Sequence, residues 1–419
     1  MAEPFERTQG ELYVEELPLT GIAAEYGTPC YVYSRSAIET AVKTLDASLS
    51  PYPHQICYAV KANSNLAVLN LMARLGAGFD VVSGGELARV IAAGGNPAQV
   101  VFSGVAKTDD ELHQALAAGV SCINIESISE IVRLEKIAAE LGLIAPVALR
   151  VNPDVDAKTH PYISTGLKEN KFGVEIAAAE AIYSQLDSSP HLSPIGIDCH
   201  IGSQLTDLAP LSDAVTRVLG LVDQLHSLGI HLHHIDIGGG LGIRYKDEEA
   251  PSLKEYAELL LALFKGRTEQ LVVEPGRSLV GNAGVLLTRV IGLKPGAEKN
   301  FALVDAAMND LLRPALYGAW HNIENLEEPS SVPPRKWDIV GPICETGDFI
   351  GQQRLLALQE GDLLAIMSCG AYGFTMASNY NSRPRAAEVM VDGGRHHLVR
   401  QRETIEQLFD RESLFPDVE

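Results

Sequence analysis

The sequence lacks the features that mark membrane proteins, secreted proteins and nucleic-acid-binding proteins. No apolar run approaches the ~18 residues that a transmembrane helix needs. The N-terminal stretch is acidic and has neither the basic nor the apolar region of a signal peptide. No basic arm offsets the formal net charge of −21, and so acidic a surface repels nucleic-acid phosphates and anionic lipid heads. We therefore expect a cytoplasmic protein that binds neither nucleic acid nor a membrane.

Metal and disulfide signals are also missing. The six cysteines are scattered without C-x-x-C or zinc-ligand spacing, so most should be reduced, packed thiols: Cys30, Cys57, Cys122, Cys199, Cys344 and Cys369. The histidine clusters at 231–234 and 396–397 have no carboxylate at ligand spacing. We expect no metal site.

Short β-branched runs, each followed by a helix-like stretch, dominate the first two thirds of the chain. At roughly 150 residues per domain, 419 residues correspond to about 2.8 domains. Alternating strands and helices predict βαβ units around a parallel sheet, and eight such units predict a (β/α)₈ barrel. The predicted strands are 56–60, 79–83, 99–103, 121–126, 146–152, 196–201, 233–238 and 271–275.

The residues that follow these runs favour the barrel over the alternative, an open doubly wound sheet. Lys61, His200 and Glu274 stand at predicted strand ends, where barrel active sites are built. An open sheet would normally carry a crevice motif after its first strand, and none occurs there. After residue 281 the pattern changes to strand-like runs. We predict an N-terminal segment (1–30) that joins a C-terminal β domain (281–419), and a barrel over 31–280.

Lys61, in YAVKANSN, directly follows a strand of the buried type. An apolar environment would penalise its ammonium form by desolvation, which suits Schiff-base formation with a carbonyl substrate or pyridoxal phosphate. The alternative is a lysine that extends to solvent from the strand end.

Two glycine-containing segments are candidates for anion binding. IDIGGGLGI (235–243) would let backbone N–H groups approach a phosphate, although a simple tight turn remains an alternative. EPGRS (274–278) combines Glu274 with Arg277, a residue that suits carboxylates and phosphates; the alternative is an acid–arginine pair that closes the barrel. CHIGSQ adds His200 and Ser203 at another strand end, where His200 could instead be purely structural.

The predicted β domain carries further reactive side chains. RPALYGAWH contains Arg313 and Tyr317, GPICETGD places Cys344 beside Glu345, and GAYGF contains Tyr372. A cysteine in such a glycine-rich loop is less easily explained by core packing. The segment SNYNSRPR (378–385) is typical of a polar loop.

Taken in order, the motifs YAVKAN, HIGSQ, IDIGGGLGI, EPGRS, RPALYGAWH, GPICETGD and GAYGF resemble those of the fold-type III pyridoxal-phosphate-dependent decarboxylases. The resemblance spans nearly the whole chain. It implies an alanine-racemase-like architecture, a cofactor-binding (β/α)₈ barrel with a C-terminal β-sandwich or barrel domain. LRVNPDVDAKTHPYISTGLKENKFG (149–173) is most similar to members that act on diaminopimelate.

The resemblance implies a role for each barrel residue. Lys61 would hold pyridoxal 5′-phosphate covalently, His200 would stack on its ring, and Glu274 would pair with the pyridinium nitrogen, which makes the cofactor a strong electron sink. Tyr372 would lie near the cofactor. The phosphate would be bound by Ser203, Gly238, Gly239, Gly240 and Gly276, with Arg277 alongside.

The resemblance also implies the substrate and the assembly. Arg277, Arg313 and Tyr317 would bind the distal end of the amino acid, Glu345 its ammonium group. Two arginines suit a second carboxylate. Cys344 would return a proton to the reacting carbon and would come from the partner subunit of a homodimer. The expected reaction is conversion of meso-2,6-diaminopimelate to L-lysine and CO₂, the last step of lysine biosynthesis. The alternatives are decarboxylation of ornithine, arginine or carboxynorspermidine, and a non-catalytic cofactor-binding homologue.

Overall fold

The computed structural model describes residues 4–156, 171–328 and 332–416. They divide into two compact units, one of Glu39–Leu279 and one of Met1–Ile38 together with Val280–Glu419. No helix in the described ranges is both long enough and apolar enough to cross a membrane.

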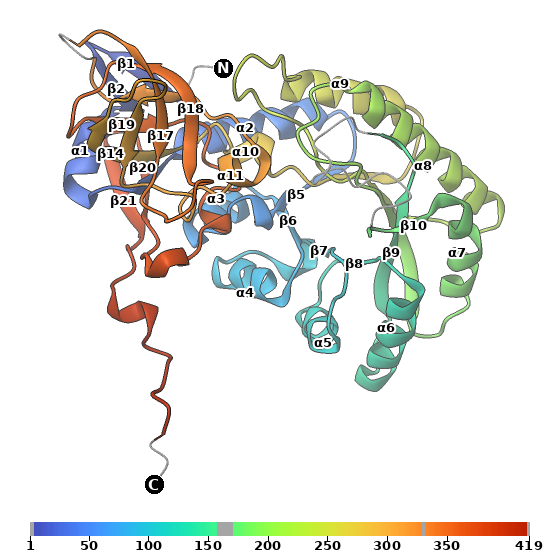
Figure 1. Cartoon of the computed structure of the whole chain (residues 1–419). Helices are drawn as coiled ribbons and strands as arrows, with labels where there is room; N and C mark the ends of the chain where they lie inside the picture. Colours follow the sequence, from blue (N-terminus) through green and yellow to red (C-terminus); the bar gives the residue numbers. More distant parts are fainter. Residues whose placement is uncertain (1–3, 157–170, 329–331, 417–419) are drawn as a thin grey trace. The chain divides into compact units, whose positions relative to one another are not determined.

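The unit Glu39–Leu279 is a barrel of parallel strands (Figure 1). Each strand pairs with the next along the chain, and the last, β13, pairs with the first, β5, so the sheet closes on itself. The predicted (β/α)₈ barrel is therefore confirmed, and the open-sheet alternative is wrong. The strands are β5 (His54–Ala59), β6 (Gly78–Val81), β7 (Val100–Phe102), β8 (Cys122–Ile125), β9 (Ala145–Asn152), β11 (Leu192–Asp198), β12 (His234–Asp236) and β13 (Gln270–Val273).

Helices alternate with the barrel strands, and several begin at residues that favour helix starts. Thr108 and Ser252 form capping boxes with Glu111 and Glu255, which satisfies backbone N–H groups that have no partner within the helix. The helices are α2 (Arg35–Leu49), α3 (Leu66–Arg74), α4 (Gly84–Ala92), α5 (Asp109–Ala118), α6 (Ile128–Leu141), α7 (Ala179–Asp187), α8 (Ala209–Ser227), α9 (Leu253–Leu263) and α10 (Arg277–Val280). A short strand not predicted from the sequence, β10 (Val174–Glu175), pairs with β9.

The second unit is built on a large sheet centred on β14 (Gly284–Lys294). β14 pairs with β4 (Cys30–Ser34), β15 (Phe301–Val304) and β19 (Leu363–Ile366). The strands β17 (Arg335–Val340), β20 (Ala387–Asp392) and β21 (Arg395–Arg400) overlap the predicted strand-like runs KWDIVG, AAEVMVDG and HHLVRQRE. No such run is predicted at β16 (Ile323–Asn325) or β18 (Phe349–Leu356). The remaining elements are β1 (Phe5–Thr8), β2 (Glu11–Val14), β3 (Leu17–Pro18), α1 (Leu19–Tyr26) and α11 (Arg313–Tyr317).

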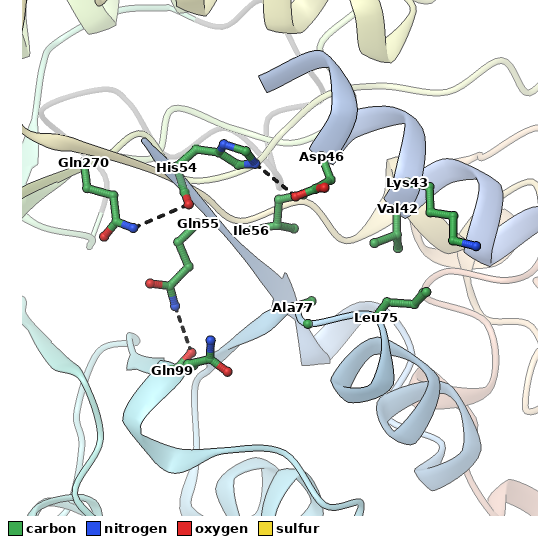
Figure 2. Close-up of a pocket in the computed structure, with 11 residues that line it drawn as sticks. Val42, Lys43, Asp46, His54, Gln55, Ile56, Leu75, Ala77, Gln99 and Gln270 are labelled. Carbon is green, nitrogen blue, oxygen red and sulfur yellow. Dashed lines mark hydrogen bonds and ion pairs between the residues drawn. The ribbon is translucent and has the colours of Figure 1, made fainter. Parts of the chain in front are cut away.

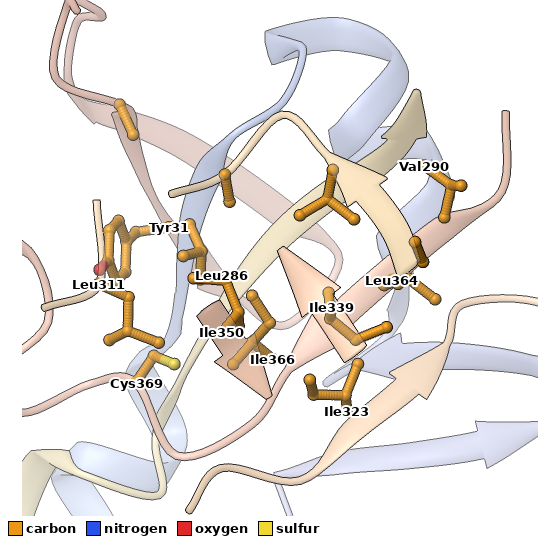
Figure 3. Packing of buried hydrophobic residues seen from close by; sticks show 14 of the residues in the cluster. Tyr31, Leu286, Val290, Leu311, Ile323, Ile339, Ile350, Leu364, Ile366 and Cys369 are labelled. Carbon is orange, nitrogen blue, oxygen red and sulfur yellow. The ribbon is translucent and has the colours of Figure 1, made fainter. Parts of the chain in front are cut away.

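This sheet has a hydrophobic core on each face. Successive side chains of a strand point to opposite sides, so one strand contributes to both cores. Tyr31 of β4 and Leu286 of β14 belong to one hydrophobic core, shown in Figure 3. Their neighbours Val32 and Leu287 belong to the other core. β4 and the first half of β14 therefore bury side chains on both faces, and their sequences there are largely apolar rather than alternating.

Candidate functional site

Lys61 lies in the short 3-10 turn Val60–Ala62, directly after β5. Its ammonium nitrogen is 2.5 Å from Oδ2 of Asp80, a fully buried residue of β6. The lysine side chain is 39% exposed, so the fully apolar surroundings expected from the sequence are wrong. A buried carboxylate holds the amine at the C-terminal end of the barrel strands, where its partner Asp80 fixes its position.

The glycine loop after β12 is packed too closely to accept side chains. A Cβ atom on Gly239 would lie 2.1 Å from the backbone oxygen of Glu274, and one on Gly240 would lie 2.4 Å from that of Gly202. The backbone N–H of Gly239 donates to Nδ1 of His200 at 3.2 Å. Only glycine permits this approach, so the loop brings its backbone N–H groups to the strand ends.

His200 is neutral in this environment. Burial lowers its pKa well below the usual value, and the positive charges of Arg150 and Lys61 lower it further. Because Nδ1 accepts a hydrogen bond from Gly239, the remaining proton belongs on Nε2. The ring is therefore available as an uncharged flat surface rather than as a cation.

Ser203 and Arg277 meet beside the glycine loop. Nη2 of Arg277 donates to Oγ of Ser203 at 2.8 Å, and Nη1 donates to the hydroxyl of Tyr245 at 2.6 Å. The guanidinium also lies over the Tyr245 ring, 5.8 Å from its centre. A hydroxyl and a guanidinium joined in this way can both donate hydrogen bonds to an oxyanion.

Three buried carboxyl groups lie together below these residues. Asp198, Asp236 and Glu274 have oxygens within 4.8 Å of one another. Burial raises the pKa of Asp236 to about 7 and that of Glu274 well above its usual value, and the neighbouring acids raise the Glu274 pKa further. Arg150 offsets part of the charge, with Nε 3.7 Å from Asp198. The cluster therefore retains protons at neutral pH and gains negative charge when a cation approaches.

The opposite end of the barrel is chemically different. Figure 2 shows a pocket of about 180 Å³ at the N-terminal ends of the strands. Amide side chains, one ion pair and apolar residues such as Val42 and Leu75 line it. His54 lies 3.1 Å from Asp46, and Gln270 donates to the backbone oxygen of His54. The Gln270 contact joins the starts of β13 and β5, and the ion pair joins β5 to α2. Such contacts have the stabilising role expected of this end of a barrel.

In the second unit, Arg313 and Tyr317 lie on one face of α11, with the guanidinium 5.7 Å from the ring centre. Arg313 is buried, and Tyr317 is half-buried. Tyr372 is half-buried and has a positive φ of 55°, an unusual conformation for an aromatic residue.

Cys344 and Glu345 lie on an exposed loop of the second unit. The other five cysteines are buried free thiols. The backbone N–H of Cys344 donates to Oδ1 of Asn381 at 3.1 Å, and the hydroxyl of Tyr380 donates to Oε1 of Glu345. Two reactive side chains are therefore presented outward by a loop with defined partners.

Several residues of the barrel site are not predicted from the sequence. Asp80, Asp198 and Asp236 each interrupt an apolar strand with a buried acid, and that interruption is a signal that could have identified them. Tyr245 carried no comparable signal. Of the diaminopimelate-like segment 149–173, residues 157–170 lie outside those that the structure describes.

The barrel residues fit pyridoxal phosphate. Lys61 supplies an amine, Glu274 a buried carboxyl group, and the glycine loop with Ser203 and Arg277 supplies phosphate donors. The sequence profile described as "Pyridoxal-dependent decarboxylase, pyridoxal binding domain" matches residues 35–281. The chain is a pyridoxal-phosphate-dependent carboxy-lyase of this class.

Relatives over the full length define the family further. The chain is 59% identical over 414 residues to the diaminopimelate decarboxylase of Pseudomonas aeruginosa, covering 99% of this chain and 100% of the relative. The structure of the Helicobacter pylori diaminopimelate decarboxylase complexed with L-lysine has 42% identity and a TM-score of 0.91, covering 94% of this chain and 99% of that one. The M. jannaschii enzyme in co-complex with L-lysine has 36% identity and a TM-score of 0.94, covering 99% and 98%. The chain belongs to the diaminopimelate decarboxylase family, which confirms the resemblance.

Proposed function

We propose that this protein removes CO₂ from meso-2,6-diaminopimelate and forms L-lysine, as the last step of lysine biosynthesis. The observation that carries the proposal is the convergence of Lys61, Glu274 and the glycine loop at one end of the barrel. The names of the relatives and the lysine in two similar structures support the choice of substrate.

The barrel unit, residues 39–279, is the cofactor-binding unit in this proposal. Lys61 would hold the cofactor covalently, and neutral His200 would pack against its ring. Ser203, Gly276, Arg277 and the glycine loop would hold its phosphate, and Tyr372 is the residue of the second unit proposed to approach the cofactor. The bound cofactor supplies an electron sink for the carbanion left by loss of CO₂.

Glu274 has the properties that this role needs. Burial and its acidic neighbours raise its pKa, so its ionised form is unfavourable until a cation arrives. A protonated ring nitrogen would be such a cation. In this proposal the pairing keeps that nitrogen protonated and Glu274 ionised, since each charge stabilises the other in a site with little water.

The residues proposed to bind the substrate have charges opposite to those of its distal groups. Arg277, Arg313 and Tyr317 bind the distal carboxylate, and Glu345 binds the distal ammonium group, so a substrate that has both is preferred over ornithine. The Cys344 thiol returns a proton to the carbon that has lost CO₂. A thiol can do this because its S–H group can act as a general acid toward a carbanion.

We also propose a cytoplasmic homodimer with shared active sites. Cys344 and Glu345 are exposed within a single chain, as expected of residues that complete the site of a partner. The free cysteines fit a reducing compartment.

The experiment that tests the function compares substrates side by side. The cofactor-loaded protein is supplied with meso-diaminopimelate, ornithine, arginine and carboxynorspermidine, and CO₂ release is measured. We expect kcat/KM for meso-diaminopimelate to exceed kcat/KM for each of the other substrates by at least about a hundredfold, since a substrate without a distal carboxylate cannot form the ion pair with Arg277 and Arg313. Faster turnover of another substrate would overturn the substrate assignment, and no turnover of any would favour a non-catalytic homologue.

A further inference from the structure

The polar segment 378–385 contacts the loop that carries the proposed proton donor. Tyr380 donates from its hydroxyl to Oε1 of Glu345. The next residue, Asn381, accepts the backbone N–H of Cys344 at 3.1 Å through its side-chain oxygen. Two adjacent residues of one loop therefore hold two adjacent residues of another, and each contact is made to a residue with a proposed role in the reaction.

Both loops are fixed to the body of the second unit. Asp348, a buried residue, accepts the backbone N–H groups of Ile343 at 2.8 Å and Met308 at 2.7 Å. The backbone N–H of Ser378 donates to the backbone oxygen of Asn309 at 2.9 Å, and Nδ2 of Asn309 donates to the backbone oxygen of Ser378 at 3.3 Å. Arg383 donates to the backbone oxygen of Asp305 at 2.6 Å. The contacts of Tyr380 and Asn381 therefore act between two anchored loops.

The backbone of the segment is also held in an unusual conformation. Asn381 has φ 55° and Ser382 has φ 52°, a region that L residues other than asparagine and aspartate rarely adopt. Such conformations persist where the surrounding structure imposes them. Here the conformation places the Asn381 side chain against Cys344 while Tyr380 reaches Glu345.

We propose that Tyr380 and Asn381 are positioning residues, which orient Glu345 toward the distal ammonium group of the substrate and Cys344 toward the carbon that receives the proton. The inference rests on the roles given to Glu345 and Cys344 in the proposed function. A hydrogen bond at Oε1 fixes the plane of the Glu345 carboxylate, and Oε2 remains an acceptor. The contact with Glu345 also raises the pKa of Tyr380, which keeps the hydroxyl protonated and donating.

The substitution Tyr380→Phe tests the first contact, because it keeps the ring and removes only the hydroxyl. We expect KM for meso-diaminopimelate to rise by about fivefold to tenfold and kcat to change less than about twofold, the pattern of a binding contact that acts through a charged partner. Tyr52→Phe is the matched control, since it removes a hydroxyl that donates to the backbone oxygen of Glu269. An unchanged KM in Tyr380→Phe would overturn the inference.

A double-mutant cycle separates this inference from the proposed function. Glu345→Gln should raise KM by itself, and adding Tyr380→Phe to it should change KM little further, because the two substitutions remove one interaction. If Glu345→Gln leaves KM unchanged, the role of Glu345 in the proposed function is wrong. If Glu345→Gln raises KM and Tyr380→Phe does not, only the positioning role is wrong.

Asn381→Gly tests the second contact. Glycine adopts the same positive φ, so the backbone is relieved while the acceptor for Cys344 is lost. We expect kcat to fall by about fivefold with KM nearly unchanged, and the solvent deuterium isotope effect on kcat to increase because proton return becomes slower. Gln9→Gly relieves a similar φ of 51° in the turn between β1 and β2 and should alter neither quantity. An unchanged kcat in Asn381→Gly would overturn the role of Asn381.

Discussion

At the scale of single residues, each unit contains a buried acid whose surroundings differ. Asp80 pairs with Lys61 in the barrel, and Asp310 is buried in the second unit. These two acids differ in their compensation. Asp80 has an ammonium group 2.5 Å away, whereas Asp310 accepts the backbone N–H of Ala307 at 3.0 Å. A buried acid that is hydrogen-bonded only to neutral donors favours its protonated form.

Lys61→Ala should abolish covalent attachment of the cofactor and lower kcat by at least about a thousandfold, because no other amine replaces the nucleophile. Attachment is measured by borohydride reduction followed by mass spectrometry of the intact chain. Lys43→Ala is the control, since Lys43 is an exposed lysine that pairs with Glu39 on α2. A labelled Lys61→Ala chain would show that another residue holds the cofactor.

Asp310→Asn should change how stability depends on pH. Burial raises the pKa of Asp310 to about 7, above the ~3.9 of an unfolded aspartate, so the folded state binds the proton more tightly. The wild type therefore loses stability as pH rises from about 4 to about 7. The variant lacks this loss. Its free energy of unfolding relative to that of the wild type should therefore rise by about 2 kcal/mol between about pH 5 and pH 8.

Urea unfolding of both proteins at the two pH values measures this difference. Asparagine keeps an oxygen for the Ala307 N–H, so the hydrogen bond itself need not be lost. Asp410→Asn, at an exposed position of the same unit, should shift stability equally at both pH values. An equal shift in Asp310→Asn as well would contradict the prediction.

At the scale of elements, the sequence predicts the barrel well because its strands are buried on both faces. Each of the eight runs overlaps an observed strand, and the ends shift by a few residues, as with 56–60 against β5 (His54–Ala59). β10, β16 and β18 were missed because short or mixed polar strands have no distinctive period. Tyr380 and Asn381 were assigned to a polar loop, since hydrogen bonds between loops distant in sequence leave no local pattern.

The glycine loop allows a test at this scale. Gly239→Ala places a methyl group 2.1 Å from the Glu274 backbone oxygen, so the loop must move and its N–H groups with it. We expect the affinity of the apoprotein for pyridoxal phosphate to fall by at least about tenfold, measured by absorbance titration.

The control for that loop is Gly220→Ala, because nothing lies within 4 Å of a Cβ atom there. Gly220 is inside α8, where alanine is favoured by about 0.5–1 kcal/mol. Cofactor affinity should be unchanged and stability should rise slightly. If Gly239→Ala also binds the cofactor normally, the loop is a structural turn and not a phosphate site.

At the scale of the whole molecule, the reactive side chains are divided between the two units. Lys61 and Glu274 belong to the barrel unit, and Cys344 and Glu345 to an exposed loop of the other. A net charge of −21 opposes the approach of two copies, so any interface must offset that repulsion locally. If copies share their sites, each chain supplies one half of two different sites, and defects in different halves should complement each other.

Mixing Lys61→Ala and Cys344→Ala chains tests this division directly. Each variant alone should be nearly inactive, because every site lacks one of the two residues. After the chains are unfolded and refolded together in equal amounts, about half of the dimers contain both variants, and one of their two sites has both native residues. Activity should therefore recover to about a quarter of the wild-type value if the sites are shared between chains. If Lys61 and Cys344 of one chain instead act together, no mixture regains activity, since every chain carries one defect.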